Sequence, residues 1–529
     1  MNFFPRPAKQ QTNAPPPAPV PARPQQAQPE PPAWESPRPQ TSATIATLIG
    51  LIVTAFVVSS GGTAGPPSKM ASVAAIGVGA SLLLGFAFEV RRSLNNLIRS
   101  DVLALLAFYF LTLFEFLFPQ ERFDAMAAHD SAANAVNVVL IAFAGMLIGR
   151  HLIHPKRQPL QKLLTHEIPP GILVLLFWLA FCMGYLHQWS APAVGWDPVK
   201  WFEYSLLSRF EQPWGRARFG DIGTLLYEMN MLINLVPPLA GIILARRQRF
   251  GAVSLFLIIL GYLLTLFFAF AGGTRSVLAT YLVTFIIGFA FAASSGRRKE
   301  LLIICATAAM LLVFGTVVMI KTRTIGLKKY LSGEVAFTLE KSESMYVDYN
   351  LYNISRLTEV FPERMPYLGI EVPYLAIIRP IPRALWSGKP EGLSSSIEKA
   401  LGFYGGNITI SASFAGEAYM AGGIFGVLLF SIFFGAINGW WSHLMGSKNS
   451  ELGILIYSSG FFAAVISMRS LFTYTTALLP TVAAIILTSY LVSYLVRKAR
   501  ALSSFSRSRA GRPGNGRRPT ESAEPYSED

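Results

Sequence analysis

Charged residues and cysteines are scarce in this chain. Of its 529 residues, 14% are Asp, Glu, Lys or Arg and 52% are hydrophobic, whereas soluble proteins carry about 25% charged residues. No set of soluble domains could cover so much apolar surface, so the composition excludes a soluble protein. The two cysteines, Cys182 and Cys305, both fall inside apolar runs, which excludes a disulfide framework.

Patterns typical of metal and nucleotide sites are also missing. No spacing of His, Cys, Asp and Glu suggests a metal site, and Gly388-Lys389 is followed by proline, so it is not a phosphate-binding loop. We therefore expect no cofactor, no metal ion and no nucleic-acid partner, although the formal net charge is +15.

What the chain does contain is a series of long apolar runs. Each has roughly 17–24 residues, enough to cross a hydrocarbon core of about 30 Å as a helix. A membrane barrel would show shorter alternating segments instead. The sequence therefore predicts an all-α polytopic membrane protein with about 12 transmembrane helices. The runs lie near residues 43–60, 70–88, 101–118, 131–149, 169–187, 222–245, 252–271, 277–293, 300–320, 422–441, 452–468 and 473–496.

Basic residues cluster in alternate connections between these runs, and the connections between the clusters hold single basic residues. Because Lys and Arg concentrate in cytoplasmic loops, this pattern predicts that both termini are cytoplasmic. The basic residues assigned to the cytoplasmic side include Arg91, Arg92, Arg99, Arg150, Lys156, Arg157, Arg246, Arg247, Arg249, Arg297, Arg298, Lys299 and Arg497.

The composition divides the chain into five parts. Residues 1–42 hold 13 of the 35 prolines, which predicts a disordered cytoplasmic tail. Residues 497–529 are predicted to form a second disordered cytoplasmic tail, which is basic. Residues 43–320 contain spans 1–9, and 422–496 contain spans 10–12. Between them, 321–421 is predicted to be a large helical extracytoplasmic loop, with 11 Lys or Arg against 10 acids. A loop of this length with its own apolar stretches is usually functional.

Several arginines lie where the charge pattern does not require them, at the outward ends of the spans. Guanidinium groups present a planar fork of donors that matches phosphate oxygens, so arginines that converge there could bind a lipid diphosphate. Each of them could instead cap a helix or bind ordinary anionic lipid. These residues are Arg216, Arg218, Arg275, Arg323, Arg379, Arg383 and Arg469.

A carboxylate is the expected general base, because outward histidines are scarce. Glu417 directly precedes the tenth run and is the preferred candidate, ahead of Glu115 and Glu228 inside other runs. Trp386 could stack on a sugar ring or anchor the chain at the membrane interface.

The stretch Ile381-Pro382-Arg383-Ala384-Leu385-Trp386-Ser387-Gly388-Lys389-Pro390 resembles a motif of bacterial oligosaccharide repeat-unit polymerases of the Wzy type. The segment from Gly416 to Gly426 and the Gly-Gly-Thr-Arg-Ser turn at 272–276 are similar to the same family, as is the large outward loop before the last spans. The resemblance covers roughly residues 250–480.

The resemblance implies a polymerase in the bacterial inner membrane, acting at its periplasmic face on undecaprenyl-diphosphate-linked oligosaccharides. It is compatible with Arg275, Arg323 and Arg469 as clamps on the leaving diphosphate and with Glu417 as the base. Arg379 and Arg383 would contact the second diphosphate or the sugar. Arg216, Arg218, Trp386 and Lys389 complete the expected substrate site, with chain-length regulators and export proteins as partners.

Three other functions fit part of this pattern. A ligase that moves finished glycan would have similar spans and arginines. A transporter or flippase for lipid-linked oligosaccharide would place polar groups near the bilayer midplane, where this sequence has few. A structural membrane scaffold would tolerate replacement of each outward arginine.

Overall fold

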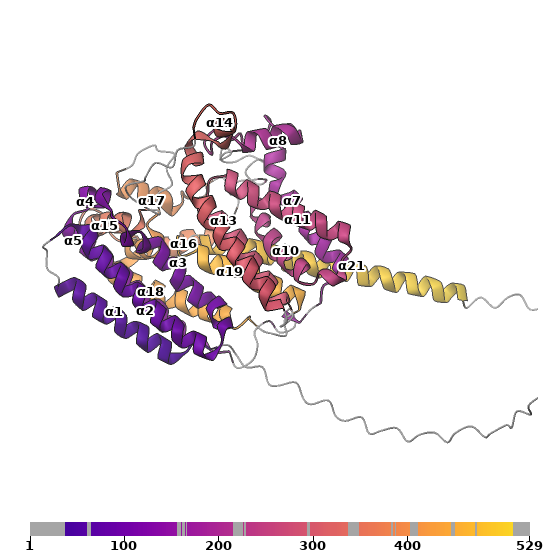
Figure 1. Cartoon of the computed structure of the whole chain (residues 1–529). Coiled ribbons are helices and arrows are strands. Elements are labelled where there is room, and N and C mark those ends of the chain that lie inside the picture. The colour runs from indigo at the N-terminus through magenta and orange to yellow at the C-terminus, as the bar shows by residue number, and fades with distance from the viewer. Residues whose placement is uncertain are drawn as a thin grey trace, which may run out of the picture. The chain divides into compact units, whose positions relative to one another are not determined.

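The computed structural model describes residues 38–60, 65–155, 160, 164–165, 167–214, 226, 229–293, 297–336, 349–381, 385–386, 388–402, 411–445, 450–470 and 473–510. Every regular element in these ranges is a helix (Figure 1). The predicted all-helical class is therefore confirmed. Most of the proline-rich tail and the end of the basic tail lie outside the described residues.

Nine helices in the described part of the chain are long and apolar enough to cross a membrane. They confirm the prediction of a helical membrane protein with many spans. Eight of them fall within α1 (Thr41–Ser60), α2 (Pro67–Arg92), α5 (His129–Gly149), α7 (Pro170–Trp189), α11 (Ala252–Ala271), α12 (Arg275–Ala292), α13 (Arg298–Ile325) and α18 (Ser413–Ser442). The ninth, Thr475–Tyr494, continues into α21 (Leu479–Ala510).

Three of the twelve predicted runs hold helices that are shorter than a full span. They are α3 (Ser100–Thr112), η3 (Asn230–Leu235) continued by α10 (Val236–Ala245), and α19 (Glu451–Ile466). The 13 residues of α3 rise only about 20 Å at 1.5 Å per residue. The count of twelve membrane crossings therefore stays a prediction.

The remaining elements are short and connect the long helices. They are η1 (Leu94–Ile98), η2 (Phe114–Leu117), α4 (Glu121–Met126), α8 (Pro198–Ser205), η4 (Arg247–Arg249), α14 (Leu327–Leu331), α15 (Asn350–Val360), α16 (Glu371–Ile378), α17 (Leu393–Ala400) and α20 (Thr473–Ala477).

The buried apolar side chains form two clusters. The first lies among α1, α2, α3, α5 and α18, where α18 packs along α5 and α1 packs along α2 (Figure 1). The second lies among α7, α10, α11, α12, α19 and α21. Outside these clusters, large apolar side chains such as Phe56, Leu83 and Phe425 remain exposed. This distribution is expected where lipid, not water, surrounds the helices.

The predicted loop of residues 321–421 is called the long connection below. Its helices α15, α16 and α17 are part of the first cluster. Leu351, Ile354 and Leu357 of α15 are completely buried. The amide of Asn350 donates to the carbonyl of Leu111 at 2.9 Å, just beyond the end of α3. The sequence predicted a large helical loop here; α15 goes further and contributes to the core of the bundle. We call the end of the bundle where α15 lies the loop end.

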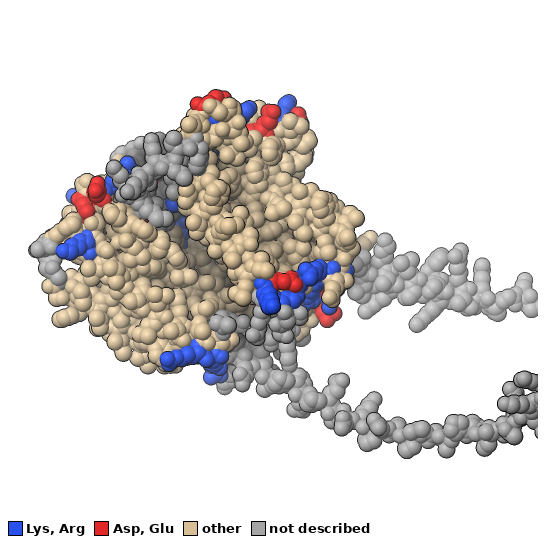
Figure 2. All heavy atoms as spheres, in the orientation of Figure 1, with Lys and Arg blue, Asp and Glu red and all other residues tan. Residues whose placement is uncertain are grey.

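Charged side chains gather at two ends of the face shown in Figure 2, and a broad band of uncharged residues separates them. One end includes the salt bridges that join Glu451 at the start of α19 to Arg246 and Arg249. This separation is what a protein with an apolar membrane belt requires.

The end opposite the loop end holds a buried ionic network. Arg99 binds both carboxylate oxygens of Asp101, at 2.9 and 3.1 Å. Arg150 contacts Asp101 Oδ2 at 3.4 Å and Glu89 at 3.2 Å, and Ser442 of α18 donates to Asp101 Oδ1 at 2.7 Å. All four charged side chains are at most 3% exposed.

This network ties together the ends of α2, α3, α5 and α18. The two guanidinium groups and the two carboxylates balance in charge, which lowers the free-energy cost of burying each charged group. Arg99 and Arg150 are among the basic residues from which the charge pattern predicted the orientation. The structure instead pairs both with buried acids, so they contribute little free positive charge at that end.

Replacing Asp101 with Asn should strongly destabilise the fold. The change keeps the shape but leaves two guanidinium groups buried against a single acid, and breaking a buried pair typically costs about 3–5 kcal/mol. The loss of stability is measured as a lower thermal unfolding temperature of the purified protein in detergent. Asp130→Asn, whose side chain is 95% exposed, is the control and should leave the unfolding temperature unchanged. Equal effects of both changes would show that the network does not stabilise the bundle.

Acid should also destabilise the bundle at this end. Burial lowers the pKa of His443 from its ordinary value of 6.5 to about 4, and burial next to Arg150 does the same for His151. The unfolded chain therefore binds more protons than the folded one between these values, and stability falls as the pH drops below about 6.5. For His443 the loss is about 2 kcal/mol at pH 5. From pH 7.5 to 5, the unfolding temperature should fall less steeply for His443→Gln than for the wild type. Parallel curves would show that protonation of His443 does not cause the loss of stability.

Candidate functional site

Glu417 is buried at the loop end, with a side chain only 4% exposed. The sequence placed it just before the tenth span, but α18 begins at Ser413, so Glu417 lies in the second turn of the helix. The residues around it, such as Ala415 and Gly416, are small and buried. They allow the helix to start early and pack beneath α15.

The turn after α19 supplies a partner for this carboxylate. Ser470 donates a hydrogen bond from its hydroxyl to Glu417 Oε1 at 2.6 Å. The backbone N–H of Phe414 donates to the carbonyl of Met468 at 3.1 Å, and Ser411 Oγ donates to the carbonyl of Arg469 at 3.0 Å. The start of α18 and residues 467–470 therefore form one unit, which places Arg469, with a partly exposed side chain, next to the Glu417 segment.

A break in α18 follows Glu417 by about one turn. Gly422 has φ −173° and Gly423 has φ 60° and ψ −146°, so the helix is interrupted there. The carbonyls of Met420 and Ala421 accept hydrogen bonds from the backbone N–H groups of Leu368 and Gly369, at 2.9 and 3.0 Å. The long connection thus satisfies the carbonyls that the break releases.

The connection after α16 is fastened to the same region. Thr475 of α20 donates to the carbonyl of Ala376 at 2.6 Å, which joins α16 to the helix that follows the Arg469 turn. Lys389 Nζ donates to the carbonyls of Arg379 and Ile381, both at 2.8 Å. This ammonium, predicted to bind substrate, holds the turn that carries the exposed Arg379.

Trp386 lies in the same turn region and is half-buried. Its ring packs against the first apolar cluster. The contact supports the fold of the segment, while part of the ring stays accessible.

Two further predicted clamps begin or end helices. Arg275 is the first residue of α12. This helix packs against α19, and the ring contact between Phe291 and Tyr457 lies at the opposite end of α12 from Arg275, so the described contacts do not join Arg275 to the Arg469 turn. Arg323 belongs to the last turn of α13, which extends to Ile325, beyond the predicted limit of 320. The side chain of Arg323 lies outside the described part of the structure.

Three predicted substrate residues, Arg216, Arg218 and Arg383, lie outside the described residues, as does the lower-ranked acid Glu228. Glu115 is described; it lies in η2 with a side chain 4% exposed. No group of three or more His, Cys, Asp or Glu side chains that could hold a metal ion occurs among the described residues.

Sequence reasoning missed Ser470, Leu368 and Gly369. Ser470 directly follows Arg469, but a single serine carries no signal, and its partner Glu417 is 53 residues away. Leu368 and Gly369 act through their backbone N–H groups, which no side-chain pattern reveals. The paired glycines at 422–423 were the available signal, because glycine pairs often mark helix kinks.

Comparison with protein-family models, with curated proteins and with solved structures finds no match for this chain. The resemblance to repeat-unit polymerases therefore rests on the sequence motifs.

Replacing Gly423 with Ala should disturb the break in α18. Its backbone conformation is close to one that only glycine adopts readily, at a cost of about 1–3 kcal/mol for other residues. An added Cβ would also lie 2.6 Å from the hydroxyl oxygen of Tyr367. We expect a lower unfolding temperature in detergent, partly restored by Tyr367→Phe. The neighbouring Gly422→Ala is the control, because its backbone is extended and no atom lies within 4 Å of the added Cβ. Equal unfolding temperatures of Gly423→Ala and Gly422→Ala would contradict the conformation described for the break in α18.

Proposed function

We propose that this protein is a membrane glycosyltransferase that polymerises lipid-linked repeat units. It transfers a glycan from a lipid diphosphate carrier to a second lipid-linked unit. The observation that carries the proposal is the buried carboxylate of Glu417, held by Ser470 next to the Arg469 segment. A buried carboxylate next to a segment that carries an arginine, at one end of the helical bundle, supports group transfer on a lipid-anchored substrate.

In the proposed reaction, a hydroxyl oxygen of the acceptor sugar forms a bond to the anomeric carbon of the donor glycan. The bond between that carbon and the diphosphate oxygen breaks, and the lipid diphosphate leaves as an anion. Glu417 accepts the proton of the attacking hydroxyl. The donors of Arg469 and Arg275 stabilise the charge that develops on the leaving diphosphate.

The remaining residues have supporting roles in this proposal. Arg323 is a third clamp on the diphosphate, and Arg379 and Arg383 contact the second lipid diphosphate or the sugar. Lys389 positions the turn that carries Arg379, and Trp386 offers the accessible part of its ring to a sugar face. Arg216 and Arg218 complete the basic region. Arginine side chains supply the positive charge, and the transfer is metal-independent.

The proposal includes a location and partners. A lipid-linked substrate and a cytoplasmic basic tail fit a bacterial inner membrane, with the loop end facing the periplasm and both termini in the cytoplasm. The substrate is an undecaprenyl-diphosphate-linked oligosaccharide, and chain-length regulators and export proteins would act on the same product.

A related transferase, a ligase that moves finished glycan to another lipid, would use the same residues. A lipid-linked oligosaccharide flippase would instead need polar groups at the middle of the bundle. The described acid Glu417 and the Arg469 turn lie at one end, which favours a transferase.

Replacing Arg469 or Glu417 tests the proposed function in cells that depend on this protein. Arg469→Ala removes a stabilising donor and Glu417→Gln removes the base, so polymer synthesis should fall by about 10²-fold or more. Gel profiles of the surface glycan should then show single repeat units in place of long chains. The exposed loop residues Arg364 and Glu363 provide the controls Arg364→Ala and Glu363→Gln, which should leave the profile unchanged.

Other profiles would identify other functions, provided that each variant is present at the wild-type level. Long polymer that accumulates on its lipid carrier would indicate a ligase, and repeat units trapped in the cytoplasmic leaflet would indicate a flippase. Full-length surface glycan in both Arg469→Ala and Glu417→Gln would overturn the proposed mechanism.

A further inference from the structure

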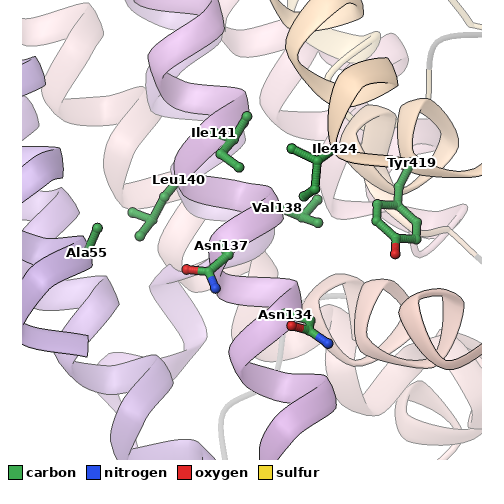
Figure 3. A pocket seen from close by; sticks show the side chains of 8 residues that line it. All are labelled: Ala55, Asn134, Asn137, Val138, Leu140, Ile141, Tyr419 and Ile424. Carbon is green, nitrogen blue, oxygen red and sulfur yellow. The ribbon is translucent and has the colours of Figure 1, made fainter. Parts of the chain in front are cut away.

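A pocket of about 410 Å³ lies between α1, α5 and α18. Figure 3 shows α5 in the middle, with Ala55 of α1 on one side and Tyr419 and Ile424 of α18 on the other. The volume is within the usual range for small-molecule sites. The pocket is distinct from the Glu417 carboxylate, whose side chain does not line it.

The lining combines apolar side chains with exposed amides. Val138, Leu140 and Ile141 give an apolar wall, whereas Asn134 and Asn137 are exposed on the same helix. An amide that faces hydrocarbon without a hydrogen-bond partner destabilises the protein. Two such amides three residues apart on a membrane helix therefore require a polar group that covers them.

The depth of the amides limits what that group can be. Asn134 and Asn137 lie five and eight residues after the start of α5, which is about 8 and 12 Å along the helix. The helix begins with the polar residues His129, Asp130 and Ser131, so the hydrocarbon boundary lies beyond them. The amides are thus near the boundary of the apolar region, where the ester groups of a glycerolipid lie.

The charge of the lining residues also limits which group can cover the amides. None of the eight lining residues is Lys, Arg, Asp or Glu, so the pocket offers no counter-ion to a diphosphate. Neutral acceptors, such as ester carbonyls, match the amide donors, and acyl chains match the apolar wall. We propose that this pocket binds one glycerolipid of the membrane, with its ester carbonyls at Asn134 and Asn137. The site is additional to the proposed diphosphate site and does not depend on glycan transfer.

The bound lipid contacts both sides of the break in α18. Tyr419 precedes Gly422–Gly423 and Ile424 follows it, and both line the pocket. The hydroxyl of Tyr419 donates to the carbonyl of Phe361 at 3.3 Å, so its ring is held against the residue that follows α15. A lipid in the pocket therefore stabilises the two segments of α18 relative to each other.

Native mass spectrometry of the full chain tests the site. The protein is purified from nanodiscs of palmitoyl-oleoyl phosphatidylethanolamine, and the retained lipid is counted. The wild type should retain one lipid that is lost from Ala55→Trp, which fills the pocket, and from the double change Asn134→Leu and Asn137→Leu. Val53→Trp is the matched control, because Val53 is 55% exposed on the same helix and does not line the pocket.

A second measurement keeps the test independent of folding. Added phosphatidylethanolamine should raise the unfolding temperature of the wild type and of Val53→Trp, but not that of the two pocket variants, because a ligand stabilises only a fold that binds it. Equal lipid retention in all variants would overturn the proposal. So would a wild-type dimer in detergent that the double Asn change dissociates, because a second copy would then cover the amides. Neither measurement uses glycan synthesis, so failure here leaves the proposed function standing.

Discussion

The backbone of α18 must satisfy its hydrogen bonds although the helix is broken inside an apolar bundle. In a bilayer no water is available for released carbonyls, so non-helical backbone persists only where protein covers it. Leu368 and Gly369 provide that cover by donating their backbone N–H groups to Met420 and Ala421. The long connection is therefore required for the break. Because the break ends the short segment that contains Glu417, the position of this carboxylate depends on the connection as well.

The same requirement explains why the connection is not a separate domain on the membrane surface. Its helix α15 buries Leu351, Ile354 and Leu357 among the first cluster. Asn353 of this helix donates from its amide to the carbonyl of Ser411 at 2.7 Å, just before α18. The connection and the bundle thus share one buried core. A change in α15 would reach the Glu417 segment through this packing and through the Asn353–Ser411 hydrogen bond.

The two ends of the first cluster are stabilised by different means. At the opposite end, four buried charges hold four helices together through hydrogen bonds to Asp101 and Glu89. At the loop end, backbone hydrogen bonds, the amides of Asn350 and Asn353 and serine–carboxylate pairs such as Ser470–Glu417 do this. A balanced ionic network resists rearrangement because moving any one partner leaves a buried charge unpaired. The described contacts of Glu417 at the loop end include the hydrogen bond from Ser470, so a neutral donor holds this carboxylate.

The sequence by itself determined the class of protein and the positions of the helices, because the thickness of a bilayer sets the length of an apolar run. It also indicated Arg469, because the pattern of cytoplasmic basic residues does not require it, and Glu417, because it is the carboxylate that directly precedes the tenth run. It did not determine which of these charges meet. Glu417 and Ser470 are 53 residues apart, and Asp101 and Ser442 are 341 apart, so only tertiary packing joins them. Packing likewise decided that Arg99 and Arg150 face acids inside the bundle, because burial of an arginine requires a counter-charge that no local pattern specifies.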